Sequence, residues 1–173
     1  PVIVQANDGT IYIMVDAYPS GIGTWQAKPG SGMKTVDGKK YLALTQKEKA
    51  ADVWSNFDFY IKDGRIYRDD GTPTEYTVDE NFYLYKNGEL QYVDQKYPDG
   101  TLTGKKVPMS IFYADADFKV YSTSYLWMAY SKDNGKTWSA PRILNDLKGD
   151  NESFYGVGPG RGLVIKNGPY SGR

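Results

Sequence analysis

The chain has 173 residues, 40% of them hydrophobic, which suffices for one ordinary domain or for a small domain beside part of another. Its 21 basic residues balance 21 acidic ones, so no overall charge attracts nucleic acid, and no apolar run approaches the roughly 20 residues needed for insertion in a membrane. Histidine and cysteine are absent, which excludes from this chain Ser-His-Asp or Cys-His catalysis, disulfides, and zinc sites built on imidazole or thiolate.

Turn signals occur along the whole sequence. The chain has 19 glycines and 16 tyrosines, and aspartate or asparagine precedes glycine at residues 8, 37, 63, 70, 87, 99, 134 and 167. Such pairs favour tight turns because they accept positive φ, and aromatic residues favour pleated surfaces. The sequence therefore predicts an all-β protein of short strands.

Residues 1–28 are predicted to form a buried hairpin followed by a loop. The apolar segments Val2–Val4 and Ile11–Val15 flank the turn at Asp8-Gly9. Their near-continuous apolarity predicts that both faces of the hairpin are covered. The chain then leaves the sheet at Asp16–Trp25, a loop rich in glycine and aromatic residues.

Residues 29–119 have more polar, alternating strands, as expected of a small β-domain with one solvated face. Two similar hairpins are predicted at 59–67 and 82–90. Thr45 and Glu48 have the spacing of a capping box, which predicts a short helix through Trp54. From residue 120 the buried pattern returns, and the chain is expected to rejoin the sheet that it left near residue 28.

An eight-residue segment after the apolar strand at 125–130 has the form S-x-D-x-G-x-T-W. Its specified positions are Ser131, Asp133, Gly135, Thr137 and Trp138. In such a turn the carboxylate accepts hydrogen bonds from backbone amides, glycine supplies positive φ and the indole packs the hairpin end. A chance Asn-Gly hairpin is the alternative, but it does not explain five residue types at fixed spacing.

This motif and several other segments resemble the bacterial sialidases (neuraminidases), whose six-bladed β-propellers carry such turns, called Asp-boxes. The resemblance is widest to the large secreted sialidases of Gram-positive bacteria that have a domain inserted in the propeller. The matching segments are Val2–Gln5, Asp37–Tyr41, Tyr125–Met128, Trp138–Pro141, Phe154–Gly162 and Lys166–Pro169.

The resemblance implies a partial six-bladed β-propeller with a small inserted β-domain. Residues 1–28 would be propeller, 29–119 the insert, and 120–173 propeller again, with the Asp-box at 131–138. It also implies a secreted or cell-surface bacterial protein. The implied partners are sialylated glycans and the remaining segments of the same propeller, with no nucleic acid and no membrane insertion.

The implied activity is that of an exo-sialidase, a glycoside hydrolase that releases terminal sialic acid by hydrolysis or by intramolecular trans-sialylation. By the order of residues in the family, the catalytic residues precede or follow this chain. We therefore assign no catalytic residue, expect no cofactor or metal, and do not expect the chain alone to cleave sialosides. The alternative is a non-catalytic carbohydrate-binding β-domain, which the abundance of tyrosine fits equally well.

The resemblance also implies substrate contacts. The loop after the first hairpin would border the N-acetyl group and neighbouring hydroxyls of the sugar through Asp16, Tyr18, Thr24 and Trp25. Tyr125 and Tyr130 match positions near the glycerol side, although in a regular strand they face opposite sides, so only a bulge would let both serve. Packing between propeller and insert is the alternative for Tyr18 and Trp25, and a turn role is the alternative for Asp16.

Overall fold

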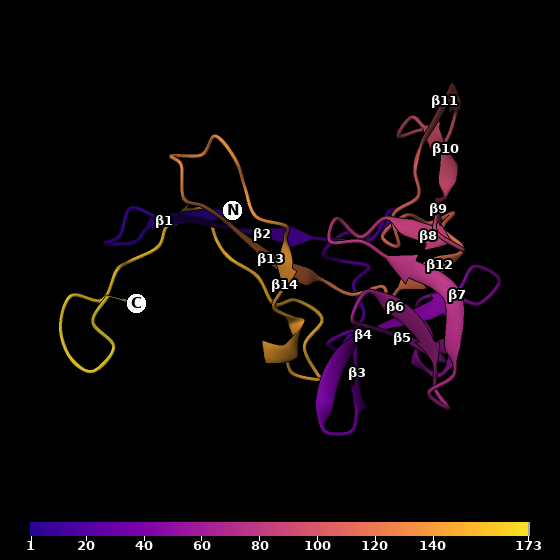
Figure 1. Ribbon diagram of the computed structural model, residues 1–173, viewed down its shortest axis with the longest axis horizontal. Helices are drawn as coiled ribbons and strands as arrows, with labels where there is room; N and C mark the ends of the chain where they lie inside the picture. The colour runs from indigo at the N-terminus through magenta and orange to yellow at the C-terminus, as the bar shows by residue number, and fades with distance from the viewer. Residues whose placement is uncertain (173) are drawn as a thin grey trace.

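The computed structural model describes residues 1–172, and almost all of their regular structure is β-strand (Figure 1). Within these residues the helices are two short 3-10 turns, η1 (Trp54–Asn56) and η2 (Asn145–Leu147). The predicted all-β class is therefore confirmed. No helix in the described part of the chain is long and apolar enough to cross a membrane.

One open sheet combines strands from the beginning and the end of the chain. Its order is β14-β13-β2-β1-β15, and neighbouring strands are antiparallel except β1 and β15. The hairpin predicted around Asp8-Gly9 is present as β1 and β2. The strands are β1 (Val2–Gln5), β2 (Ile11–Ala17), β13 (Tyr125–Ser131), β14 (Arg142–Ile143) and β15 (Gly160–Arg161).

The middle of the chain forms a second sheet, in which β12-β4-β5-β6-β7-β8-β9 follow one another and β3 pairs with β4. Figure 1 shows it to the right of the first sheet. The chain passes from the first sheet to the second between β2 and β3, and it returns to the first sheet between β12 and β13. These positions are close to the domain boundaries predicted at residues 28 and 119, and the boundaries stay predictions. The strands are β3 (Met33–Val36), β4 (Lys39–Gln46), β5 (Phe59–Lys62), β6 (Arg65–Arg68), β7 (Pro73–Val78), β8 (Leu84–Lys86), β9 (Glu89–Leu90) and β12 (Phe118–Val120).

A separate two-stranded hairpin projects from this second sheet (Figure 1). It consists of β10 (Tyr92–Lys96) and β11 (Leu102–Pro108), which pair antiparallel with an irregularity between Asp94 and Lys96. Most of its residues are exposed, so the hairpin contributes little to the core.

Several predicted turns form as expected. In four of them both residues have positive φ: Asp37-Gly38 (50° and 75°), Asp63-Gly64 (50° and 74°), Asn87-Gly88 (51° and 84°) and Asn134-Gly135 (59° and 82°). The first three are two-residue hairpin turns, which require this conformation. In three others the aspartate carboxylate accepts a hydrogen bond from the backbone N–H of a threonine two residues later. The distances are 2.9, 2.8 and 2.9 Å for Thr10, Thr72 and Thr101.

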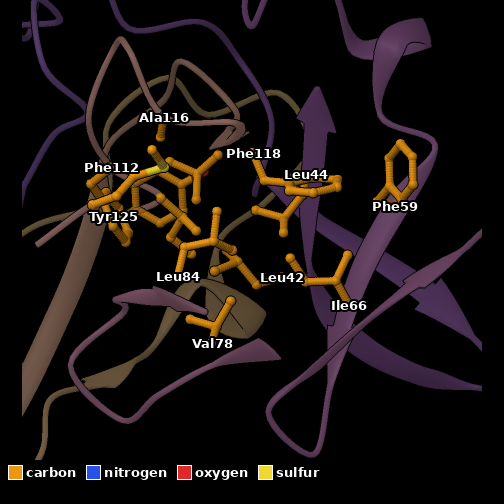
Figure 2. Packing of buried hydrophobic residues seen from close by; sticks show 13 residues of the cluster. Leu42, Leu44, Phe59, Ile66, Val78, Leu84, Phe112, Ala116, Phe118 and Tyr125 are labelled. Carbon is orange, nitrogen blue, oxygen red and sulfur yellow. The ribbon is translucent and has the colours of Figure 1, made fainter. Parts of the chain in front are cut away.

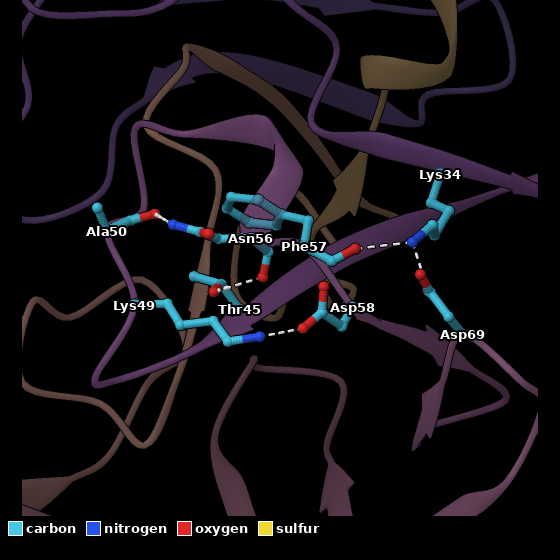
Figure 3. A network of polar contacts seen from close by, with 8 residues as sticks. All are labelled: Lys34, Thr45, Lys49, Ala50, Asn56, Phe57, Asp58 and Asp69. Atoms are coloured by element: carbon cyan, nitrogen blue, oxygen red, sulfur yellow. Dashed lines mark hydrogen bonds and ion pairs between the residues drawn. The ribbon is translucent and has the colours of Figure 1, made fainter.

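The helix predicted from Thr45 to Trp54 is wrong. Thr45 lies in β4, where it is fully buried and pairs with Lys119 of β12. Its hydroxyl donates a hydrogen bond to the Asn56 carbonyl (2.8 Å) rather than capping a helix, as Figure 3 shows. Pairing with a strand more than 70 residues away outweighs the local capping signal, since helix propensity is a weak preference that tertiary context overrides.

The main hydrophobic core lies within the second sheet and the segment that follows β11 (Figure 2). The Phe112 ring joins this core to the first sheet because it packs edge-on against Tyr125 (5.2 Å between centroids) and Trp127 (5.0 Å) of β13. The labelled members of the core are Leu42, Leu44, Phe59, Ile66, Val78, Leu84, Phe112, Ala116, Phe118 and Tyr125.

The first sheet is less covered than its sequence predicts. All seven residues of β2 are only partly buried, although their apolar run led us to expect cover on both faces. Large apolar side chains also remain exposed on or near this sheet, among them Ile3, Phe154, Ile165 and Leu163, which is 87% exposed. The described residues therefore leave apolar surface of this sheet open.

Candidate functional site

Asp16 lies at the end of β2, paired with Leu126 of β13. One oxygen of its carboxylate, Oδ1, accepts a hydrogen bond from the backbone N–H of Val157 (2.9 Å). The approach is close enough that a Cβ on Gly156 would clash with this carboxylate, so glycine is required there. Asp16 is thus held by a segment 141 residues away rather than by a local turn.

The loop after β2 brings the other predicted substrate residues together. The Tyr18 hydroxyl and the Thr24 hydroxyl are hydrogen-bonded at 3.1 Å, which closes the loop on itself. The Ser20 backbone N–H donates to the Phe112 carbonyl (2.8 Å) and anchors the loop to the middle of the chain. Trp25 is 95% exposed, so it does not pack between the two parts of the chain.

The two tyrosines predicted near the glycerol side are separated by the sheet. β13 pairs with β2 in continuous register from Tyr125 to Ser131, so there is no bulge to bring Tyr125 and Tyr130 to one face. Tyr125 is completely buried, its hydroxyl donates to the Tyr121 carbonyl (3.0 Å), and burial raises its pKa well above the usual value. This corrects the expectation for Tyr125, because a side chain with no exposed surface packs the core here and cannot contact a ligand.

Tyr130 lies on the other side of β13 and is exposed. Its ring is 6.1 Å from that of Tyr12, and the Lys132 ammonium is 5.6 Å from its centre. Its exposure leaves Tyr130 available to a ligand, but it faces away from the buried Tyr125.

The segment 131–138 forms a tight turn stabilised by one carboxylate. Asp133 Oδ1 accepts hydrogen bonds from the Ser131 hydroxyl (2.8 Å) and the Thr137 N–H (2.9 Å), and Oδ2 accepts from the Thr137 hydroxyl (2.6 Å). These hydrogen bonds, of which those from Thr137 have the largest effect, lower the pKa of Asp133 to about 2. Gly135 has φ of 82°, and its N–H donates to the Ser131 hydroxyl (2.8 Å), while Trp138 is 44% exposed. These hydrogen bonds hold the turn together.

Sequence reasoning missed the role of Lys148, which is only 2% exposed. Its ammonium donates hydrogen bonds to the Thr123 hydroxyl (2.5 Å), the Ser124 carbonyl and hydroxyl (3.2 and 3.1 Å) and the Ser153 carbonyl (3.2 Å). Burial lowers its pKa to about 8. Lysine is seldom buried, so its type and position gave no signal.

These contacts position the segment that holds Asp16. The Ser124 hydroxyl, which binds Lys148, also accepts a hydrogen bond from the Tyr155 N–H (3.0 Å). The chain from Lys148 to Val157 is therefore docked on the turn before β13, and this docking brings the Val157 N–H to Asp16.

The arrangement suits binding rather than acid-base chemistry. One oxygen of the Asp16 carboxylate is left to accept a further hydrogen bond, Tyr18 and Thr24 carry hydroxyl groups, and the indole of Trp25 is exposed. Among residues 1–172, no three His, Cys, Asp or Glu side chains gather closely enough to hold a metal ion.

No protein-family model matches the chain. It is 37% identical over 172 residues to the anhydrosialidase of Macrobdella decora, which covers 94% of this chain and 22% of that protein. Its structure matches the intramolecular trans-sialidase from Ruminococcus gnavus with a TM-score of 0.91 and 40% identity, over 99% of this chain and 37% of that one.

A leech intramolecular trans-sialidase complexed with 2,7-anhydro-Neu5Ac also matches with a TM-score of 0.91, at 35% identity over 99% of this chain and 26% of the other. The chain thus spans between about a fifth and two fifths of the length of these relatives. Sequence and fold agree over nearly every residue of the chain, which therefore belongs to the sialidase family.

Proposed function

We propose that this chain forms part of the scaffold and part of the substrate wall of an exo-sialidase that acts as an intramolecular trans-sialidase on sialylated glycoconjugates. The observation that carries the proposal is the match over 99% of the chain, at 40% identity, to an enzyme described by that activity. The leech enzyme with the same description matches as well and is complexed with 2,7-anhydro-Neu5Ac.

The loop of residues 16–25 supplies the wall. Val157 orients the Asp16 carboxylate, which leaves its second oxygen to accept hydrogen bonds from sugar hydroxyls. The Tyr18–Thr24 pair stiffens the loop, and Trp25 presents its indole to solvent. A rigid acceptor beside an exposed aromatic surface is the composition of a sugar-binding wall.

The reaction class requires no water as a reactant. The bond from C2 of sialic acid to the leaving sugar breaks, a bond from C2 to the sugar's own O7 forms, and the O7 proton ends on the leaving oxygen. In hydrolysis by the same scaffold, C2 would instead bond to the oxygen of a water molecule, and a proton of that water would end on the leaving oxygen. In this proposal the chain contributes binding groups, and the groups that perform bond cleavage lie in other segments of the protein.

We further propose that those segments complete a six-bladed propeller around the first sheet, with the turn at 131–138 as one of its Asp-boxes. The exposed apolar side chains near the first sheet, such as Ile3 and Leu163, support this because a neighbouring blade would bury them. Secretion or attachment at the cell surface fits an enzyme whose substrates are extracellular glycans. Cell fractionation of the source organism tests that location.

The experiment incubates the complete polypeptide that carries this segment with 3′-sialyllactose and identifies the products by mass spectrometry and NMR. We expect lactose and 2,7-anhydro-Neu5Ac, which is lighter than free sialic acid by one water. Free sialic acid alone would establish hydrolysis instead. Binding without turnover would favour the alternative, a carbohydrate-binding β-domain, which the exposed Trp25 would also suit.

The contribution of the wall is tested by Asp16→Asn, which keeps an acceptor for Val157 but removes the charge. We expect KM to rise about tenfold, because one hydrogen bond to a charged group is lost. Circular dichroism should show that the fold is intact. Asp8→Asn, which changes an exposed aspartate in the β1–β2 turn, is the matched control and should leave KM unchanged. Equal effects of the two substitutions would refute the role of Asp16.

A further inference from the structure

A pocket of about 550 Å³ lies between the projecting hairpin and the rest of the chain, within the size range of small-molecule sites. One side is the hairpin, through residues 93–98 and Val107. The other side is the turn at residues 113–115, together with Ser20 and Gly21. The hairpin and the turn are close in sequence, whereas Ser20-Gly21 comes from a segment more than 70 residues earlier.

Specific contacts hold these walls in place. Lys96 of β10 forms an ion pair with Asp115 across the pocket. Val93 and Val107 pair across the hairpin, and both are partly buried where they line the pocket. The Ser20 N–H donates to the Phe112 carbonyl, which fastens the Ser20-Gly21 turn next to the turn at residues 113–115. The pocket is defined by these contacts rather than by a loose loop.

The lining suits a neutral sugar. Tyr97 and Tyr113 offer aromatic faces, and Gln95 offers an amide, groups that stack on sugar rings and bind hydroxyls. The charged lining groups are Asp94, Lys96 and Asp115, two acidic and one basic, so the pocket carries one net negative charge. This charge disfavours the anionic sialic acid itself, while carboxylates accept hydrogen bonds from neutral hydroxyls.

The position of the pocket links it to the proposed substrate wall. Ser20 and Gly21 belong to the same loop that carries Asp16, Tyr18, Thr24 and Trp25. One side of this loop would face the sialic acid, and the turn at Ser20-Gly21 faces the pocket. A glycan bound through its terminal sialic acid would thus bring its next sugars toward the hairpin.

We propose that this pocket is a subsite for the neutral sugars to which the sialic acid is attached, so that the hairpin β10–β11 selects the leaving group. The inference rests on the proposed function for the sialic acid side. The strands of this hairpin are mostly exposed and contribute little to the core. An isolated two-stranded hairpin is marginally stable, and the subsite gives this one a role in binding.

The first test is an NMR titration with lactose of the complete polypeptide that carries this segment, isotopically labelled in residues 1–173. We expect amide shifts at residues 93–98 and 113–115 and none around Asp16. Tyr97→Ala should weaken lactose binding about fivefold, the loss of one aromatic contact, whereas Tyr92→Ala should not. The two tyrosines match as a pair because they lie on the same hairpin and are 58% and 52% exposed, but only Tyr97 lines the pocket.

The second test separates this inference from the proposed function. In the complete polypeptide, Tyr97→Ala should raise KM for 3′-sialyllactose about fivefold and leave KM for an aryl sialoside, which has no second sugar, unchanged. No lactose-induced shift at the hairpin, or an equal effect on both substrates, would overturn the subsite. Failure of the proposed function would instead appear as no turnover of either sialoside.

Discussion

The buried Lys148 makes the free energy of unfolding of this chain rise from neutral to alkaline pH. Lys148 is 2% exposed, and its ammonium contacts only hydroxyl and carbonyl oxygens at hydrogen-bond distance. Burial lowers its pKa from 10.5 to about 8 in the folded chain. The folded state therefore binds this proton less tightly than the unfolded state does, and the charged form destabilises the fold.

The sign and size follow from linkage. Between the folded pKa and the unfolded one, the unfolded chain binds more protons, so the free energy of unfolding rises with pH. For pKa values of about 8 and 10.5, the rise between about pH 7 and about pH 9.5 is about 2 kcal/mol. The window ends below about pH 10, where half of the tyrosines in the unfolded chain are ionised.

Lys148→Met replaces the ammonium with an uncharged side chain of similar length. We expect the wild-type chain to show this rise in urea unfolding followed by tryptophan fluorescence, and the variant to show none. Lys136→Met, at an exposed lysine, should keep the wild-type dependence. A Lys148→Met variant whose stability still rises by the same amount would refute the assignment to Lys148.

Two further predictions concern turns and close packing. Asp133→Asn should lower the melting temperature at neutral pH. In the wild type the contribution of Asp133 to stability should be complete above about pH 4 and lost toward about pH 2, because hydrogen bonds from Thr137 and Ser131 lower its pKa. Identical acid unfolding of variant and wild type would contradict this. Gly32→Ala should destabilise the fold by about 2 kcal/mol or more, since its Cβ would lie 2.5 Å from the Tyr125 hydroxyl oxygen at φ of 72°. Gly38→Ala, with φ of 75° and open space, measures the backbone strain alone, and equal losses from the two alanines, both measured by urea unfolding, would exclude the clash.

The errors of the sequence analysis have a common physical origin. The capping-box signal of Thr45 is local, and the strand pairing with Lys119 that overrides it joins residues more than 70 positions apart. The family resemblance implied Tyr125 as a ligand residue, but its burial under Phe112 and its hydrogen bond to Tyr121 depend on how the second sheet docks on β13. Burial is a property of the assembled fold and is not encoded at one position.

The amino-acid sequence by itself determined the features whose energetics are local. Turns such as Asp63-Gly64 form as predicted because positive φ is a property of two adjacent residues, and the all-β class follows from many such turns between apolar runs. Only the tertiary structure decided the site. The hydrogen bond from Val157 to Asp16, the burial of Lys148 and the pocket beside Tyr97 each join segments distant in sequence, and such contacts exist only once the chain has folded.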